Sequence, residues 1–381
     1  MRAWLDIDLD RLARNFSVVQ THVGPDSGLI AVVKSDAYGH GLLRIGAELD
    51  RLGVAGYAVI SLEEALSLRE ASARPVLVMG YLSDEEIAEA IRRDLTLSLY
   101  DAPLADLYAS IARKVGTPAK VQLKVETGLN RLGVPINEAA GLLENWSRCD
   151  ALQLTGIYSH LSTSADRATD LEQLELFERF MKDHGAHLGE VPLHLCNSHG
   201  LRHFPEGFFG AVRVGLALYG VESVLPGLEP TLECRARVMQ RKRVRRGEGV
   251  SYNKLFRAPK DMDVAVLAIG YAEGLSQALT GKMEVLINGH RRPVVGQICM
   301  NLCVVDVDGI PAERGDAATL IGRETMADGS TDEIRVADMA KAAGIRHHEI
   351  ITRLGLSLPR RYKAACAAVE ASPGSVSAAA L

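Results

Sequence analysis

Short apolar runs alternate with amphipathic stretches along the first 220 residues of the chain. The runs are continuous rather than alternating, which is typical of strands that are buried on both faces of a parallel sheet. Eight strands separated by helical stretches form the pattern of a (β/α)8 barrel, which we predict for residues 1–228. The eight runs are 29–34, 57–60, 75–80, 95–100, 120–126, 152–160, 193–198 and 212–220.

Two of the intervening stretches carry signals for the start of a helix. Ser61 with Glu64, and Ser83 with Glu86, have the spacing of a capping box, in which a hydroxyl and a carboxylate cap the first helical turn. The pattern therefore predicts helices that begin just after Ser61 and Ser83. An open doubly wound sheet is the alternative architecture, although such sheets usually have fewer strands.

The pattern changes after about residue 228, where β-like runs begin to dominate. Asn288-Gly289 lies between two of these runs and is a strong signal for a two-residue hairpin. We therefore predict a mostly β second domain over residues 229–370. Residues 371–381 have little apolar surface to bury, and we predict a disordered tail there.

Composition and charge exclude several classes of protein. The 43 basic and 48 acidic side chains give a net charge of -5, which lacks the basic footprint of a nucleic-acid-binding protein. No apolar run approaches the ~20 residues that span a bilayer, and three aspartates within the first ten residues argue against a signal peptide. The six scattered cysteines form no zinc pattern. We expect a cytoplasmic protein with reduced thiols, without a metal, nucleic-acid or membrane partner.

Polar side chains gather where the predicted barrel strands end. Barrel enzymes have their active sites at the C-terminal ends of the strands. Taken alone, a lysine at such a position is more often a surface residue. However, the loops "NSHG" and "VRVGLALYG" hold small residues whose backbone amides can approach a phosphate. A phosphate site beside a buried lysine suggests a Schiff base to pyridoxal phosphate. The strand-end residues are Lys34, Lys124, Arg131, His160, Asn197, Ser198 and Arg213.

The stretch around Lys34, "AVVKSDAYGHG", resembles the pyridoxal-lysine signature of the alanine racemase family. The resemblance covers about residues 4–362. It implies a pyridoxal phosphate-dependent enzyme that interconverts L- and D-alanine and supplies D-alanine for cell-wall peptidoglycan. It also implies a homodimer whose active sites each take residues from the partner. The other motifs, in family order, are "KVETGLNRLG", "YSHLSTSAD", "CNSHG", "VRVGLALYG", "VSYN", "IGYAEG" and "GQICMNLCVVDV".

The resemblance implies two proton-transfer groups, Lys34 and a Tyr252 that comes from the partner subunit. Racemisation needs such a pair, because a base removes the Cα proton from one face and an acid returns a proton to the other. Free tyrosine titrates near ~10, so a cationic neighbour is needed to favour its anion. His160 and Arg213 resemble the family residues that provide this environment. Arg213 also matches the residue that faces the pyridine nitrogen and keeps it unprotonated.

Further positions match family residues that bind the cofactor or the substrate. Lys124 matches a lysine that is often carbamylated in the family, and the resulting anion would hold Arg131 in place. Tyr271 resembles a gate at the entrance. The cofactor positions are Lys34, Tyr38, His160, Asn197, Ser198, Arg213, Gly215, Leu216 and Tyr362, and the substrate positions are Arg131, Tyr271, Met300 and Asn301.

Two departures from the family pattern leave the substrate open. Asn301 stands where the family usually has an aspartate near the substrate carboxylate, and its amide can donate a hydrogen bond. Serine, or a broader range of amino acids, is therefore an alternative to alanine. Leu356 stands where some members have a tyrosine that contacts the phosphate, which makes Tyr362 the better C-terminal match. A non-catalytic pyridoxal phosphate-binding barrel is a more remote alternative, since such proteins lack a second domain.

Overall fold

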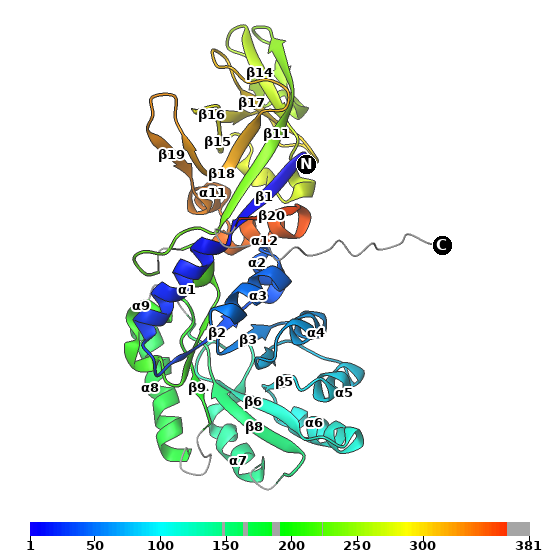
Figure 1. Cartoon of the computed structure of the whole chain (residues 1–381), viewed down its shortest axis with the longest axis vertical. Helices are drawn as coiled ribbons and strands as arrows, with labels where there is room; N and C mark the ends of the chain where they lie inside the picture. The colour runs from blue at the N-terminus through cyan, green and yellow to red at the C-terminus, as the bar shows by residue number, and fades with distance from the viewer. Residues whose placement is uncertain (147–148, 163–166, 185–190, 223, 364–381) are drawn as a thin grey trace, which may run out of the picture.

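In the computed structural model, the chain forms a barrel and a second sheet, which lie at opposite ends of an elongated molecule (Figure 1). The structure describes residues 1–146, 149–162, 167–184, 191–222 and 224–363. The tail predicted for residues 371–381 lies outside these residues. No helix within them is long and apolar enough to cross a membrane.

Eight parallel strands close the barrel, which confirms the prediction from the apolar runs. The strand order is β5-β4-β3-β2-β10-β9-β8-β6, and pairing of β5 with β6 completes the ring. The closed ring excludes the open-sheet alternative. The strands are β2 (Gly28–Val32), β3 (Gly56–Val59), β4 (Val76–Val78), β5 (Thr96–Leu99), β6 (Ala119–Glu126), β8 (Leu152–Tyr158), β9 (Leu193–His194) and β10 (Ala211–Val214).

The helices that follow the barrel strands begin close to where the capping signals predicted. Ser83 and Glu86 form the full capping box, with each side chain accepting a hydrogen bond from the other residue's backbone N–H. At the other site only half of the box forms, because the Glu64 carboxylate accepts from the backbone N–H groups of Asp36 at 3.0 Å and Ile60 at 3.2 Å rather than from that of Ser61. The helices are α1 (Leu9–Val23), α3 (Leu42–Arg51), α4 (Leu62–Ala71), α5 (Asp84–Arg92), α6 (Ala102–Val115), α7 (Ile136–Trp146), α8 (Arg167–His184), α9 (Gly200–His203) and α10 (Leu216–Tyr219).

The second domain is built on a nine-stranded sheet of order β19-β18-β15-β16-β17-β14-β11-β1-β20. Ile287 pairs with His290 across the predicted hairpin, and both Asn288 and Gly289 have positive φ, as a type I′ turn requires. The strands are β1 (Ala3–Asp8), β11 (Leu232–Val244), β14 (Met262–Leu267), β15 (Glu284–Ile287), β16 (His290–Val295), β17 (Cys303–Asp306), β18 (Ala317–Thr325), β19 (Thr331–Ile334) and β20 (Arg360–Lys363).

Both ends of the described chain meet in this second sheet. β1 pairs antiparallel with β11 and parallel with β20, although the sequence pattern assigned the first residues to the barrel. Strand pairing over such separations depends on tertiary packing, which a local pattern does not encode. Helices α11 (Val336–Ala343) and α12 (His347–Ser357) precede β20. The domain boundary that the sequence pattern places between residues 228 and 229 stays a prediction.

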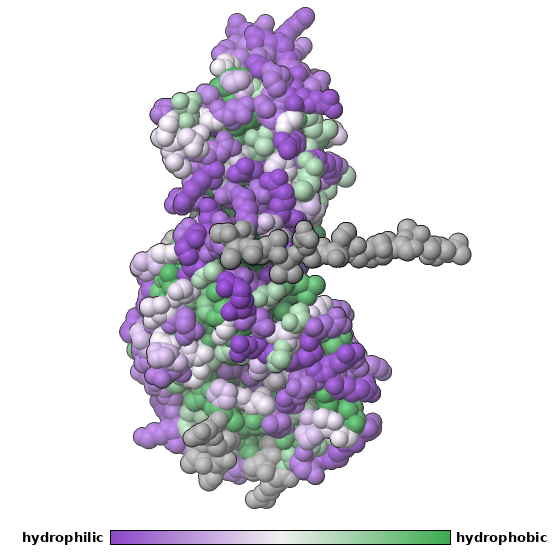
Figure 2. All heavy atoms as spheres, in the orientation of Figure 1, coloured by the Kyte–Doolittle hydropathy of each residue, from purple (hydrophilic) through white to green (hydrophobic). Residues whose placement is uncertain are grey.

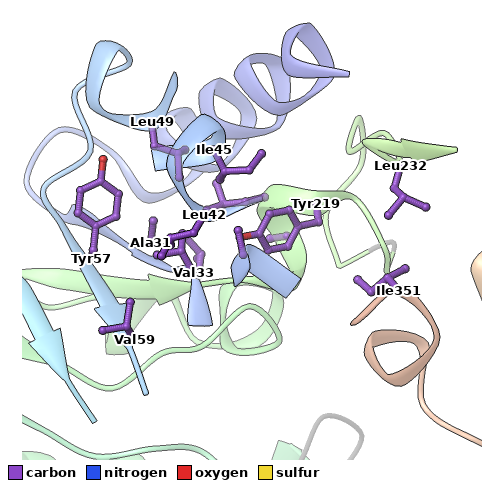
Figure 3. Close-up of a cluster of buried hydrophobic side chains, with 14 of the residues drawn as sticks. Ala31, Val33, Leu42, Ile45, Leu49, Tyr57, Val59, Tyr219, Leu232 and Ile351 are labelled. Carbon is purple, nitrogen blue, oxygen red and sulfur yellow. The ribbon is translucent and has the colours of Figure 1, made fainter. Parts of the chain in front are cut away.

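A continuous apolar core joins the two domains. Ile351 of α12 and Leu232 of β11 belong to the same buried cluster as Tyr219 and the barrel residues Ala31 and Ile45 (Figure 3). Hydrophilic residues dominate the end of the second domain around β14, in the view of Figure 2. The shared core holds α12 against the barrel, at the same end as the strand-end residues described below.

Candidate active site

A cavity of about 450 Å³ opens at the C-terminal ends of the barrel strands. All the barrel residues that the sequence predicted for the site line this cavity, because parallel strands end at the same rim. Among the described residues, no group of three or more His, Cys, Asp or Glu could hold a metal ion. The predicted residues that line the cavity are Lys34, Tyr38, Lys124, Arg131, His160, Asn197, Ser198, Arg213, Gly215 and Leu216.

Lys34 begins a short turn, α2 (Lys34–Tyr38), that follows β2. Four consecutive residues, from Ser35 to Tyr38, have φ of 54–55° and are left-handed. This conformation costs L-amino acids roughly 1–2 kcal/mol per residue, so such a run persists only where surrounding contacts enforce it. Burial, followed by the charge of Arg131, lowers the pKa of Lys34 and favours its neutral, nucleophilic amine.

Arg213 is a buried guanidinium whose hydrogen-bond partners are all neutral. It donates to Nδ1 of His194 at 2.6 Å, to Nδ1 of His160 at 3.0 Å and to the carbonyl of Ser159 at 2.6 Å. Burial lowers the pKa of Arg213 to about 10. Since arginine can only donate, Nδ1 of both histidines must accept, which leaves the ring proton on Nε2. Burial and then Arg213 lower the pKa of His160 well below its usual value, consistent with a neutral ring.

The cavity is strongly cationic. Lys34, Lys124, Arg131 and Arg213 all line it, and none of its lining residues is an aspartate or glutamate. Burial, then Arg131 and Arg213, lower the pKa of Lys124 to about 8. Glu64 and Glu126, which lie outside the lining, oppose the lowered pKa values of Lys34 and Lys124 without cancelling them. An anion in the cavity would relieve the remaining repulsion between the cations. The cavity is therefore suited to a ligand that carries phosphate or carboxylate groups.

The phosphate end of the predicted site is closely packed. Ser198 Oγ accepts hydrogen bonds from the backbone N–H groups of Gly215 and Ala217, each at 3.2 Å. A Cβ on Gly215 would lie 2.9 Å from the Tyr38 hydroxyl, so only glycine leaves this space open. Asn197 Oδ1 accepts from the backbone N–H of His199 at 2.9 Å. These contacts fix the loops after β9 and β10 against the turn that carries Lys34.

The structure does not bring every predicted residue to the cavity. Tyr252, Tyr271 and Met300 lie on the second domain with exposed fractions of 68%, 43% and 56%, and none of them lines the cavity. Asn301 donates its amide to Glu273 Oε1 at 2.8 Å. A carboxylate in place of that amide would face another carboxylate.

Tyr362 also lies outside the cavity, although the sequence placed it among the cofactor-binding residues. It lies on β20, beside β1, where its hydroxyl donates to the carbonyl of His40 at 3.0 Å. Its contact is therefore with the loop that follows Tyr38. A motif match could not reveal this, because the direction of the side chain depends on how β20 pairs.

Sequence reasoning missed two polar residues that line the cavity, Tyr158 and His199. Tyr158 lies in the β8 run, and Arg213 lies over its ring at 4.9 Å. His199 lies in the quoted "NSHG" loop, and its Nε2 is 2.5 Å from Glu222 Oε2. The same carboxylate contacts His347 at 2.6 Å, and these partners, His199 first, lower the pKa of Glu222 to about 2. The sequence could have indicated these two residues only by their position, since each lies within two residues of a predicted site residue.

Comparison with known proteins identifies the family. The model of the alanine racemase N-terminal domain matches residues 7–223, and that of the alanine racemase C-terminal domain matches residues 231–362. The chain belongs to the alanine racemase family. The alanine racemase of Synechocystis is 36% identical over 94% of this chain and 98% of its own length, and that of Desulfovibrio desulfuricans is 33% identical over 94% and 97%.

Solved structures agree with this assignment and bear on the cofactor. Alanine racemase from Streptomyces lavendulae superposes with a TM-score of 0.89 at 31% identity, covering 96% of this chain and 98% of that one. The Bartonella henselae enzyme, with a TM-score of 0.85 at 27% identity over 95% and 100%, holds covalently bound pyridoxal phosphate. The cavity of this chain fits that cofactor, because it offers a lysine amine of lowered pKa and several cations for the phosphate.

The comparisons also bear on the alternatives. The match to a C-terminal domain model distinguishes this chain from a cofactor-binding barrel that lacks a second domain. The relatives named above are alanine racemases, and neither a serine-preferring enzyme nor a non-catalytic protein is favoured. The family, the barrel followed by a β domain, and the cofactor predicted from the sequence are confirmed.

Proposed function

We propose that this chain, a pyridoxal phosphate-dependent alanine racemase by family, moves the substrate proton with two groups, Lys34 and Tyr252. The observation that carries the proposal is a cationic cavity around a lysine of lowered pKa. Lys34 Nζ would hold the cofactor until the substrate amine displaces it, and the cofactor would then supply electron withdrawal that makes the substrate Cα proton acidic and leave the lysine amine free. The other residues of the site bind, orient and exchange protons.

Lys34 would act on one face of the substrate. Its amine accepts the Cα proton in one direction and returns a proton in the other. Burial and the charge of Arg131 favour the neutral amine, which is the form that can accept a proton. Arg131, on the rim of the same cavity, would bind the substrate carboxylate. Lys34 and Arg131 would thereby fix both the orientation of the substrate and the position of its proton acceptor.

Tyr252 would act on the opposite face, from the partner of a homodimer. Within its own chain it is 68% exposed and lies outside the cavity, as do its exposed neighbour Leu255 and the exposed Met300. A symmetric dimer would bury these apolar side chains over the partner's barrel. The cations of that barrel would favour a tyrosinate, and the neutral His160 would remain available to hydrogen-bond it.

Alanine is the substrate that the local contacts favour. The Asn301 amide is engaged with Glu273, which is also ion-paired with Arg2. The amide is therefore directed toward its own domain, which removes the reason to expect selection of a serine hydroxyl. A cytoplasmic location and the supply of D-alanine for peptidoglycan remain predictions from the sequence.

Complementation between two inactive variants tests both the residues and the shared site. Lys34→Ala and Tyr252→Phe should each be inactive alone. Co-expressed in equal amounts, half of the dimers are mixed, and each mixed dimer has one intact site, so about a quarter of wild-type racemisation should return. Polarimetry or chiral chromatography with L-alanine measures this. Activity no higher than that of the separate variants would contradict a site shared between subunits.

A further inference from the structure

The left-handed turn after Lys34 is held by a side chain from the far end of the chain. Arg360, on β20, donates from Nε to the carbonyl of Gly39 at 2.8 Å and forms an ion pair with the carboxylate of Asp36. Nη2, which binds Asp36, also donates to the carbonyl of Gly355 at 2.7 Å. One guanidinium therefore joins the turn of the barrel to the end of α12 in the second domain.

Asp36 has further contacts that hold it in place within the turn. Asp36 Oδ1 accepts from the backbone N–H of Leu42 at 2.6 Å, and Oδ2 is the oxygen that binds Arg360. The backbone N–H of Asp36 in turn donates to Glu64. Charge-assisted hydrogen bonds such as the one between Arg360 and Asp36 are stronger than those between neutral groups. Asp36 is therefore fixed from three directions.

Helix α12 lies directly against the turn. An added Cβ on Gly355 would lie 2.1 Å from the Cα of Gly39, so the two backbones are in contact. Arg360 spans this contact, and only 20% of its side chain is exposed. The Asp36 side chain is 35% exposed, so the ion pair is partly shielded from water and keeps more of its strength than one on the open surface. The contact is thus suited to setting the position of the turn.

The turn α2 determines the relative position of two residues that line the cavity. Lys34 stands at its start and Tyr38 at its end, and both line the cavity. Residues 35–38 are all non-glycine residues with positive φ, a conformation that unconstrained L-residues avoid. If the turn relaxed, the lysine amine and the Tyr38 hydroxyl would separate from the loop that carries Gly215.

We propose that Arg360 is a positioning residue for the cofactor lysine. It holds the turn at residues 35–38 in its left-handed form and thereby places Lys34 Nζ relative to the phosphate end of the site. The inference rests on the proposed function, because it takes Lys34 as the residue that carries the cofactor. Arg360 itself does not line the cavity, so it acts through the turn.

The test compares Arg360→Ala with Arg361→Ala. Arg361 is adjacent on β20 and also pairs with a carboxylate, that of Asp6 at 2.8 Å, but it has no bond to the turn. For each full-length variant we would measure the Kd for pyridoxal phosphate by absorbance, the kcat and KM for alanine, and the Tm. Arg360→Ala should raise the Kd at least tenfold and lower kcat, with partial rescue by added guanidinium. Arg361→Ala should keep the Kd within twofold, whatever its Tm.

A wild-type Kd and kcat for folded Arg360→Ala would overturn the inference. If that variant does not fold, Arg360→Lys decides by the same readouts, because lysine keeps the charge but not the two-pronged geometry. A Kd raised severalfold supports the inference, and an unchanged Kd overturns it. Borohydride reduction of the wild-type holoenzyme fixes the cofactor to the lysine that carries it, and this separates the two proposals. If the cofactor is found on Lys34, only the role of Arg360 is in question. If it is found on another residue, the proposed function itself is refuted.

Discussion

The charge state of Lys124 provides a direct test of the electrostatics of the cavity. Its ammonium lies 5.9 Å from the centre of the Tyr158 ring, and burial together with Arg131 and Arg213 lowers its pKa to about 8. At pH 7.5 about a quarter of these amines are therefore neutral, roughly 200-fold more than for an amine with the ordinary lysine pKa. The neutral amine is the form that adds to carbon dioxide.

Carbamylation would relieve the repulsion around this lysine. The amine adds to carbon dioxide and releases a proton, which replaces a cation by an anion beside Arg131. A hydrogen bond between such charged groups contributes about 1.5–3 kcal/mol. We therefore expect Lys124 to be carbamylated, and we expect Lys124→Ala to raise the KM for alanine roughly 10- to 100-fold, because Arg131 loses its anionic partner.

The carbamate can be observed directly. Protein equilibrated with ¹³C-bicarbonate should give a carbonyl resonance that is absent from Lys124→Ala and that strengthens between pH 7 and 9 as more amine becomes neutral. Lys120→Ala is the matched control, since Lys120 lies on the same strand but pairs with Asp94 at 2.6 Å. Absence of a Lys124-dependent signal at saturating bicarbonate, with an unchanged KM in Lys124→Ala, would refute the reasoning.

Two further predictions concern the contacts around the site. Asn301→Asp should place a second carboxylate beside Glu273 and lower stability at pH 8 by about 1–3 kcal/mol. The loss should shrink below about pH 5 as the pair takes up a proton, and equal thermal stability at pH 8 would contradict it. Gly355→Ala would place a methyl group 2.1 Å from the Cα of Gly39, so both Tm and cofactor affinity should fall. Gly141→Ala, where the added methyl meets nothing within 4 Å inside helix α7, should leave cofactor affinity unchanged and should not lower the Tm.

The sequence by itself determined the architecture and the barrel half of the site. Continuous apolar runs were enough to predict the eight strands, because a strand buried on both faces needs apolar side chains at every position. The turn at Asn288-Gly289 could also be predicted from the sequence, since few residue pairs adopt positive φ at two successive positions. Lys34 and Arg213 were also found from sequence, because parallel strands in a barrel bring their C-terminal ends to one rim.

Only the tertiary structure decided which distant residues support those groups. The Glu64 carboxylate binds the backbone of Asp36 as well as the start of its own helix, Asn301 binds Glu273, and Arg360 reaches the turn across 324 positions of sequence. β1 likewise joins the second sheet instead of the barrel. Each of these choices depends on which groups packing brings within hydrogen-bond distance, and a local pattern of hydrophobic and polar residues does not contain that information.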